Sequence, residues 1–233
     1  MTYSSPFQTP WFLQTFADNF IKKDYPVDII FPFEKQGPSL IFLGMRKVLE
    51  KEELSDYGDA DIDPILLVQK AKEIGCQEIV LDYVLDDSHL YSFFKSQKNA
   101  SIVHQEVAPI VQLPPTWDSY LQTLERVERK ELKRKLRRLE TIPYEFEVGP
   151  ANNEKLFLEF IKLHKLSNTN KVTFMSSEME KFFHDLAIVP KEDWPMSIAT
   201  LKIENNYSAA ILFFENETTA MLYNSGYDPA YKY

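Results

Sequence analysis

Three short runs of apolar residues near the carboxyl end of the chain constrain its fold more than any other feature. The runs cover residues 196–204, 208–215 and 221–223, and turn-forming residues at 205–207 and 216–217 join them. Apolar, β-branched and aromatic residues of this kind are typical of strands. Because connections this short join neighbouring antiparallel strands, we expect a three-stranded meander.

Two segments upstream of these runs have the spacing of amphipathic helices. Residues 153–167 and 178–188 carry apolar side chains three and four positions apart, which places them on one face of a helix. A short strand is predicted before them at residues 144–148. The order strand, two helices and meander predicts a mixed α/β fold of the α+β class, in which helices cover a sheet.

The third run ends in polar and turn-forming residues. It closes with Tyr223, and the residues that follow include Asn224, Ser225, Gly226, Asp228 and Pro229. Polar groups at the end of a core strand are a natural place for a ligand. We therefore expect a binding site where this strand ends.

Four segments of the chain resemble a known family. They are LKRKLRRLE at residues 132–140, FIKLHKLS at 160–167, SAAILFF at 208–214 and YNSGYDPAYKY at 223–233. In this order and spacing they resemble the FemAB-related, CelD-like acyltransferases, which have the GNAT fold. The likeness extends over most of the chain.

The resemblance implies tandem GNAT-like halves. An N-terminal GNAT-like domain is expected at residues 1–115, a basic connecting helix at 116–143 and a C-terminal GNAT-like domain at 144–233. In the family, the second half continues with a glycine-containing turn and a helix that bind the pyrophosphate of acyl-CoA. We therefore expect a second half that is truncated after its fourth strand, and an unpaired apolar edge on that strand.

The resemblance also implies an N-acyltransferase, in which an amine attacks the carbonyl of the acyl donor directly. The donor is acyl-CoA or, in an alternative that stays open, aminoacyl-tRNA, and the acceptor is a small-molecule or peptide amine. His164 lies in the helix that this family packs beside the acceptor groove. A histidine with a pKa near neutrality can take a proton from an amine. A structural histidine, held by a neighbouring carbonyl, is the other interpretation.

Further site residues follow from the same resemblance. Four of them lie at the end of the third strand. Tyr223 is expected to be catalytic or to be part of the core. Asn224 and Ser225 are expected to bind the cofactor, and Asp228 the substrate. Tyr57 and Asp59 belong to an acidic, glycine-containing loop. This loop faces the groove between the halves in the family, so both are expected to bind substrate, although a plain surface loop is the commoner outcome.

A basic segment precedes the predicted C-terminal domain. All eight Lys and Arg residues between 116 and 149 lie from Arg126 to Arg138. A leucine stripe predicts one helix here, capped near residue 116 and ended by Pro143.

The basic face of this helix has two interpretations. It is either a solvated surface, held by pairs such as Glu131 with Lys135, or an anion site formed by Arg134, Arg137 and Arg138. Its ligand would then be a nucleotide phosphate, an acidic carrier or tRNA. A non-catalytic module that binds an anionic partner on the GNAT scaffold therefore stays a rival hypothesis.

The first 115 residues alternate between helix and strand patterns. Leu113, Pro114 and Pro115 mark the end of this region. The predicted helices are 10–20, 64–74 and 87–95, and the predicted strands are 27–33, 40–43, 78–82 and 106–113.

Several classes of protein are disfavoured. A formal net charge of −9 argues against a general nucleic-acid binder. The four histidines lack zinc-site spacing, and the acidic loop at 56–63 lacks the ligand spacing of a calcium loop, so we expect no metal. No apolar run reaches the roughly 18 residues that span a bilayer. The start of the chain also lacks a signal-peptide pattern, so we expect a cytoplasmic protein.

Overall fold

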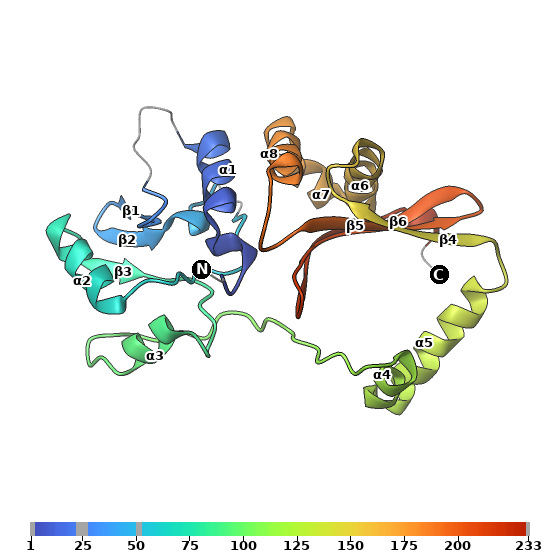
Figure 1. Ribbon diagram of the computed structural model, residues 1–233, viewed down its shortest axis with the longest axis horizontal. Coiled ribbons are helices and arrows are strands. Elements are labelled where there is room, and N and C mark those ends of the chain that lie inside the picture. Colours follow the sequence, from blue (N-terminus) through green and yellow to red (C-terminus); the bar gives the residue numbers. More distant parts are fainter. Residues whose placement is uncertain (1–2, 22–27, 50–52, 232–233) are drawn as a thin grey trace. The chain divides into compact units, whose positions relative to one another are not determined.

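A computed structural model describes residues 3–21, 28–49 and 53–231 of the chain (Figure 1). The chain divides into two compact units. The first unit consists of Met1–Glu106, Ser176–Met196 and Phe214–Thr219, and the second unit of Val107–Met175, Ser197–Phe213 and Ala220–Tyr233. The units interleave along the sequence. The boundaries expected from the sequence, at residues 115–116 and 143–144, stay a prediction.

In its described residues, the first unit contains a small sheet and four α-helices. Strands β1 (Phe33–Gln36) and β2 (Ser39–Phe42) are antiparallel, and β3 (Glu78–Val80) is parallel to β2. The helices are α1 (Pro10–Phe20), α2 (Pro64–Glu73), α3 (His89–Lys95) and α8 (Ser177–Ile188).

Helices α1 and α8 lie side by side in the first unit, although they are far apart in the sequence (Figure 1). The rings of Phe12 and Phe182 meet edge to face, with centroids 6.1 Å apart. On the rim of this contact, the amide of Asn19 donates a 3.0 Å hydrogen bond to Asp185. The apolar face predicted for the helix at residues 178–188 is the face that packs against α1.

Most of the second unit is built around a four-stranded sheet. Its strand order is β4 (Tyr144–Pro150), β5 (Met196–Ile203), β6 (Asn206–Glu215) and β7 (Ala220–Tyr227). Strand β4 runs antiparallel to β5, from the pair Tyr144 and Ile203 to the pair Pro150 and Ser197. Helices α6 (Glu154–Ser167) and α7 (Thr169–Phe174) lie on one face of this sheet (Figure 1). The predicted meander and the α+β class are thus confirmed.

The connection between β5 and β6 fixes their register. Glu204 and Asn205 have φ values of 51° and 68°, which is the left-handed conformation that two-residue hairpin loops require. The turn therefore lies one position before the predicted turn at 205–207. It places Lys202 and Tyr207 on the same face of the sheet, with the ammonium of Lys202 4.8 Å from the ring centre of Tyr207.

Helix α6 lies directly against β7, and Gly226 permits the contact. A Cβ atom at Gly226 would lie 2.2 Å from the backbone nitrogen of His164 and 2.5 Å from its Cα atom. No side chain fits in that space. Leu156, Phe160 and Leu163 of α6 are buried beside this contact. The two backbones therefore approach as closely as only glycine permits.

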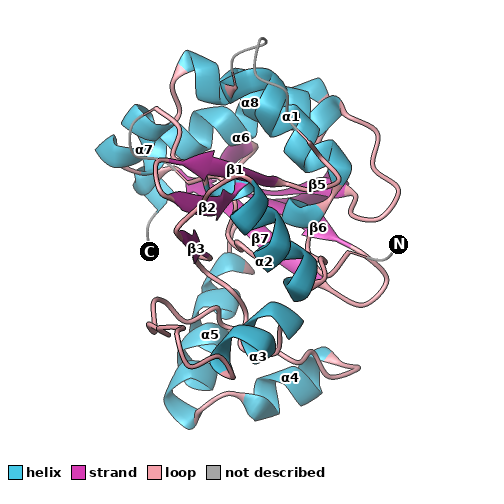
Figure 2. Cartoon of the chain, turned by 90° about the vertical axis from the view of Figure 1, so that its left-hand side faces the viewer, coloured by secondary structure: helices cyan, strands magenta, loops and turns pink. Residues whose placement is uncertain are grey.

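The helix predicted over the basic segment is two helices. Helix α4 (Trp117–Thr123) is capped by Thr116, whose hydroxyl accepts a 3.1 Å hydrogen bond from the backbone N–H of Ser119, and α5 spans Arg126–Leu139. Leu124 and Glu125 are extended, with ψ of 144° and 148°, and so break the helix. The guanidinium of Arg129 donates to the carbonyl of Leu121 at 3.4 Å. This bond partly replaces a helical bond that the break removes. Figure 2 shows α4 and α5 beside each other.

Two predicted strands are wrong within the described part of the chain. In the strand predicted at 27–33, Val27 lies outside the described residues, and the carboxylate of Asp28 accepts hydrogen bonds from Ile30 at 2.9 Å and Phe31 at 3.1 Å. These bonds make a turn, so β1 begins only at Phe33. Residues 106–113 form no strand. Val107 is 88% exposed and Ile110 is 76% exposed, because no neighbouring strand pairs with this segment.

The remaining predicted elements are present, with ends that move by a few residues. Among the described residues, the sequence patterns missed strand β1, the break between α4 and α5, the short helix α7 and the 3₁₀ turns. Of the helices in the described residues, none combines the length and the apolar character that crossing a membrane would require.

We predict that Gly226→Ala lowers the free energy of unfolding by about 1–3 kcal/mol, because the new methyl group forces α6 and β7 apart. Gly149→Ala is the matched control, since its Cβ atom would approach only the end of the Leu156 side chain, at 2.8 Å. That side chain can rotate away, so the loss is smaller. Urea titration of both variants measures the difference, and equal losses would contradict the close approach.

Candidate functional site

The outer edge of β7 is the first feature of the candidate site. In the sheet that the described residues form, β7 is an outermost strand. The N–H of Asp228 donates to the carbonyl of Ser208 in β6 at 2.9 Å. Because backbone groups alternate between the two edges of a strand, those of Ser225 and Tyr227 point away from β6. Side chains of α6 and α7 meet them there.

Ser167 binds the outer edge at Tyr227. This residue ends α6 and is buried. The N–H of Tyr227 donates to the Ser167 hydroxyl oxygen at 2.8 Å, and the hydroxyl donates to the carbonyl of Leu163 at 2.9 Å. A helix side chain thus takes the place that a further strand would occupy.

His164 binds the same edge two residues earlier. Its ring is 2% exposed, lies between Phe160 and Phe174, and places Nδ1 3.1 Å from the carbonyl oxygen of Ser225. Since a carbonyl only accepts, Nδ1 carries the hydrogen. Within the described residues, Nε2 is buried and has no hydrogen-bond partner.

Burial governs the protonation of His164. It lowers the pKa of the imidazole to about 4, the nearby charge of Lys171 acts in the same direction, and the bond to Ser225 opposes them. The ring is therefore neutral at pH 7. A neutral ring with hydrogen on Nδ1 leaves a lone pair on Nε2.

Lys171 is a second donor to the carbonyl of Ser225. It lies on α7. The side chain of Asn168 caps the first turn of this helix by accepting a 3.0 Å hydrogen bond from the backbone N–H of Lys171. Its ammonium donates to the Ser225 oxygen. Burial lowers the pKa of this ammonium. Two side chains from neighbouring helices therefore converge on one backbone carbonyl.

The predictions named His164 and Ser225 but missed Ser167 and Lys171. In the sequence, Ser167 follows His164 by three positions and Lys171 follows Ser167 by four. The first spacing places His164 and Ser167 on one side of α6, which was a usable signal for Ser167. The second spacing crosses the extended Asn168 between α6 and α7, so nothing in the sequence pointed to Lys171 or paired these residues with β7.

An open pocket of about 520 Å³ lies where β7 ends. The charged residues that line it are Glu131, Arg134 and Lys135 of α5 and Asp228, and Leu201 and Ile203 of β5 line it as well. The carboxylate of Asp228 accepts the N–H of Ala230 at 2.9 Å. Charges of both signs therefore line one hollow with apolar walls.

The three arginines predicted to form an anion site lie at different places on α5. Arg134, in the pocket beside β7, makes a bidentate contact with Glu131, at 2.8 and 2.7 Å. Arg137 lines a second hollow of about 820 Å³ between α4 and α5, and not the first. Arg138 is exposed on the same helix. Of the three predicted anion-site residues, only Arg134 reaches the pocket at the end of β7.

Tyr57 and Asp59 lie in the first unit. Asp59 is 6% exposed, and one of its oxygens accepts the N–H of Ala60 at 2.9 Å. Burial raises the pKa of this carboxyl, and a hydrogen bond from Ser88 acts against that rise. The ring of Tyr57 packs against Phe7, with centroids 5.9 Å apart. Their contribution to a shared substrate site stays a prediction.

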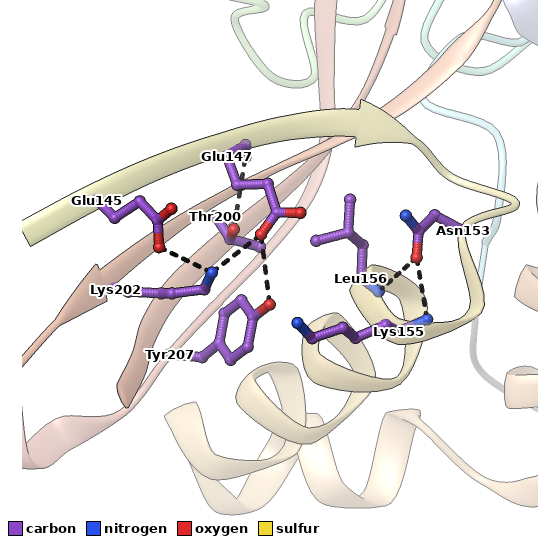
Figure 3. Close-up of polar contacts among 8 residues, drawn as sticks. All are labelled: Glu145, Glu147, Asn153, Lys155, Leu156, Thr200, Lys202 and Tyr207. Atoms are coloured by element: carbon purple, nitrogen blue, oxygen red, sulfur yellow. Dashed lines mark hydrogen bonds and ion pairs between the residues drawn. The ribbon is translucent and has the colours of Figure 1, made fainter. Parts of the chain in front are cut away.

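A separate polar network joins β4 to β5 (Figure 3). The ammonium of Lys202, on a side chain only 14% exposed, lies 2.9 Å from Glu145 and 3.1 Å from Glu147. The phenol of Tyr207 donates to Glu147 at 3.4 Å. The bond from Lys202 lowers the pKa of Glu147. All these charges have partners, so the network serves to hold the strands together.

In the part of the chain that the structure describes, no three His, Cys, Asp or Glu residues gather as metal ligands would.

The comparisons with known proteins bear on the second unit above all. Residues 126–233 match the family model of the acetyltransferase (GNAT) domain. The match begins at the first residue of α5, and the first 125 residues lie outside it. Neither the curated proteins nor the solved structures gave a significant match. GNAT domains in general transfer an acyl group from acyl-CoA to an amine, so the matched region indicates N-acyl transfer.

We predict that Lys202→Met lowers the free energy of unfolding at pH 7, because it leaves Glu145 and Glu147 without their shared cation. Glu147 has a folded pKa below its ordinary value of 4.5. Its contribution is therefore present above that pH and is lost as the pH falls below it. The difference between variant and wild type should shrink in acid.

Lys162→Met is the control for this change, since it removes an ion pair from a lysine side chain that is 63% exposed. Exposed pairs contribute little to stability. The measurement is the urea midpoint of each variant and of the wild type, from neutral to acid pH. Equal effects of the two substitutions would show that the network does not hold β4 to β5.

Proposed function

We propose that this protein is an N-acyltransferase that takes its acyl group from acyl-CoA and passes it to an amine acceptor. The observation that carries the proposal is the match of residues 126–233 to the GNAT domain. The geometry of the second unit supports it. Strand β7 is outermost in the described sheet, and side chains of α6 and α7 hold its outer edge in place.

The reaction that we propose is a direct transfer. The lone pair of the amine attacks the thioester carbonyl, the new C–N bond forms, and the C–S bond breaks to release the thiolate. The proton that the amine loses balances the one that the thiolate gains. The backbone N–H of Ser225, which faces the outer edge of β7, is proposed to stabilise the negative oxygen that develops. Tyr223, half-buried on the same strand, has a phenol that can return a proton to the thiolate.

His164 fits a different role from the general base expected from the sequence. A base must reach the proton that it removes, whereas this ring is 2% exposed and its pKa is about 4. A group with so low a pKa is a poor acceptor at neutral pH. We therefore propose that the amine loses its proton to another group or to solvent.

The pocket beside β7 suggests the class of acceptor. Arg134 and Lys135 now contact Glu131 of the same pocket. An acidic group of the acceptor would take the place of that carboxylate, and Asp228 would bind the ammonium of the same molecule. A pocket of about 520 Å³ has the size of small-molecule sites. We propose an acceptor that carries an amine and an acidic group on a short apolar frame.

The experiment that tests the function is a thiol-release assay with the full chain. Acyl-CoA donors of several lengths are incubated with a panel of amines, some of which carry a carboxylate or phosphate. We expect release of free thiol that depends on the amine, with acylated amine seen by mass spectrometry. A parallel reaction with aminoacyl-tRNA tests the alternative donor. No acylation with any donor, from protein that is folded, would refute the proposal.

We predict that Asp228→Asn raises the KM for the amine about tenfold, as loss of a charge-assisted contact of roughly 1.4 kcal/mol implies. The KM for acyl-CoA should not change. Asp118→Asn is the control, because Asp118 lines the second hollow and not the pocket beside β7. Steady-state kinetics of both variants with varied amine give the comparison. An unchanged KM in Asp228→Asn would remove this residue from the acceptor site.

An anion-binding module without catalysis is the second candidate. None of the residues of α5, all of which the structure describes, is buried. The helix carries eight Lys and Arg residues against two Glu. Absence of acyl transfer, together with binding to tRNA that weakens steeply with salt, would favour this candidate.

A further inference from the structure

We propose that His164 and Lys171 are positioning residues, which hold the carbonyl of Ser225 and so keep the outer edge of β7 in one conformation for acyl transfer. This inference rests on the proposed function, because the position of the edge matters only if the acyl donor binds there. Both donors meet one oxygen, His164 through Nδ1 at 3.1 Å and Lys171 through its ammonium.

The Ser225 carbonyl needs such donors because the sheet cannot supply them. It points away from β6, on the outer edge where Ser167 binds Tyr227. The peptide that contains it joins Ser225 to Gly226, whose φ is less restricted than that of other residues. The N–H of Gly226 in the same peptide faces β6 on the other edge, so the carbonyl end is the one that, among the described residues, only the two donors fix. Without these donors the outer edge is less well held at Ser225, and the N–H of Ser225, in the preceding peptide on the same edge, is less well fixed with it.

The state of His164 distinguishes a positioning role from ordinary packing. The bond to Ser225 requires hydrogen on Nδ1, and this leaves the buried Nε2 without a partner in the described residues. A buried acceptor without a partner lowers stability. A leucine or phenylalanine would fill the site between Phe160 and Phe174 without that loss. The histidine is therefore unfavourable for packing alone, and the contact with Ser225 accounts for it.

The two donors are compatible because only one of them carries a charge. Burial and the charge of Lys171 lower the pKa of His164 to about 4. The pair therefore brings one positive charge and one neutral donor to the carbonyl. Two cations at this distance would repel each other in a buried place.

Substitutions at both positions test the proposal. His164→Leu removes the donor, while His164→Asn keeps an N–H close to the place of Nδ1. We expect His164→Leu to lower kcat by about tenfold to a hundredfold, the size of effect that a misplaced reacting group produces. His164→Asn should restore most of the rate, and the exposed His104→Asn should have no effect. Lys171→Met should lower kcat, and Lys171→Arg should retain most of it.

Stability is measured on the same variants. We expect His164→Leu to be at least as stable as the wild type, because it leaves no buried acceptor without a partner. A loss of rate without a loss of stability separates positioning from folding. A folded His164→Leu variant with the wild-type kcat would overturn the proposal. Equal losses of rate in the Leu and Asn variants would also overturn it.

A spectroscopic readout separates this proposal from the proposed function. Nitrogen-15 NMR of the imidazole reports which ring nitrogen carries the hydrogen, whether or not the protein turns over a substrate. We expect a neutral ring with hydrogen on Nδ1 at pH 7. Hydrogen on Nε2 would contradict the contact with Ser225. The contact confirmed, with no acylation of any amine, would instead refute the proposed function and with it the positioning role.

Discussion

The close approach of α6 to β7 is the contact on which the candidate site depends. Gly226 brings the strand against the backbone at His164, where a Cβ atom would lie only 2.2 Å from a helix nitrogen. Because the helix is so near, its side chains and those of α7 reach the outer edge of the strand. Ser167 binds Tyr227, and His164 and Lys171 bind Ser225. An edge that would otherwise be open is held by three side chains.

Two polar clusters in the second unit differ in how well their groups are satisfied. Around Lys202, carboxylates and a phenol surround one ammonium, so each charge has a partner. Around Ser225, the buried Nε2 of His164 has no partner among the described residues. Networks whose members are all paired stabilise a fold, whereas an unpaired buried group lowers stability. The first cluster therefore fits a structural role, and the second fits a role in function.

Local sequence patterns predicted elements well where local forces decide them. The apolar spacing at 153–167 and 178–188 gave α6 and α8 almost residue for residue, and the turn-forming asparagines gave the meander. The patterns failed where secondary structure depends on a partner strand or on the backbone dihedral angles of single residues. Residues 106–113 have strand-like composition but no partner strand. The leucine stripe of the basic segment runs through the break at Leu124 and Glu125.

The sequence by itself determined the order of strand, helices and meander in residues 144–227, the α+β class and the polar end of the last strand, because helix and strand periodicity act over a few residues. Only the tertiary structure decided which side chains meet. It brought Lys171 to Ser225 and placed Arg134 and Asp228 in one pocket, across long separations in the chain. Such contacts depend on how closely two backbones approach, and that distance is set by packing, at this site by the missing side chain of Gly226.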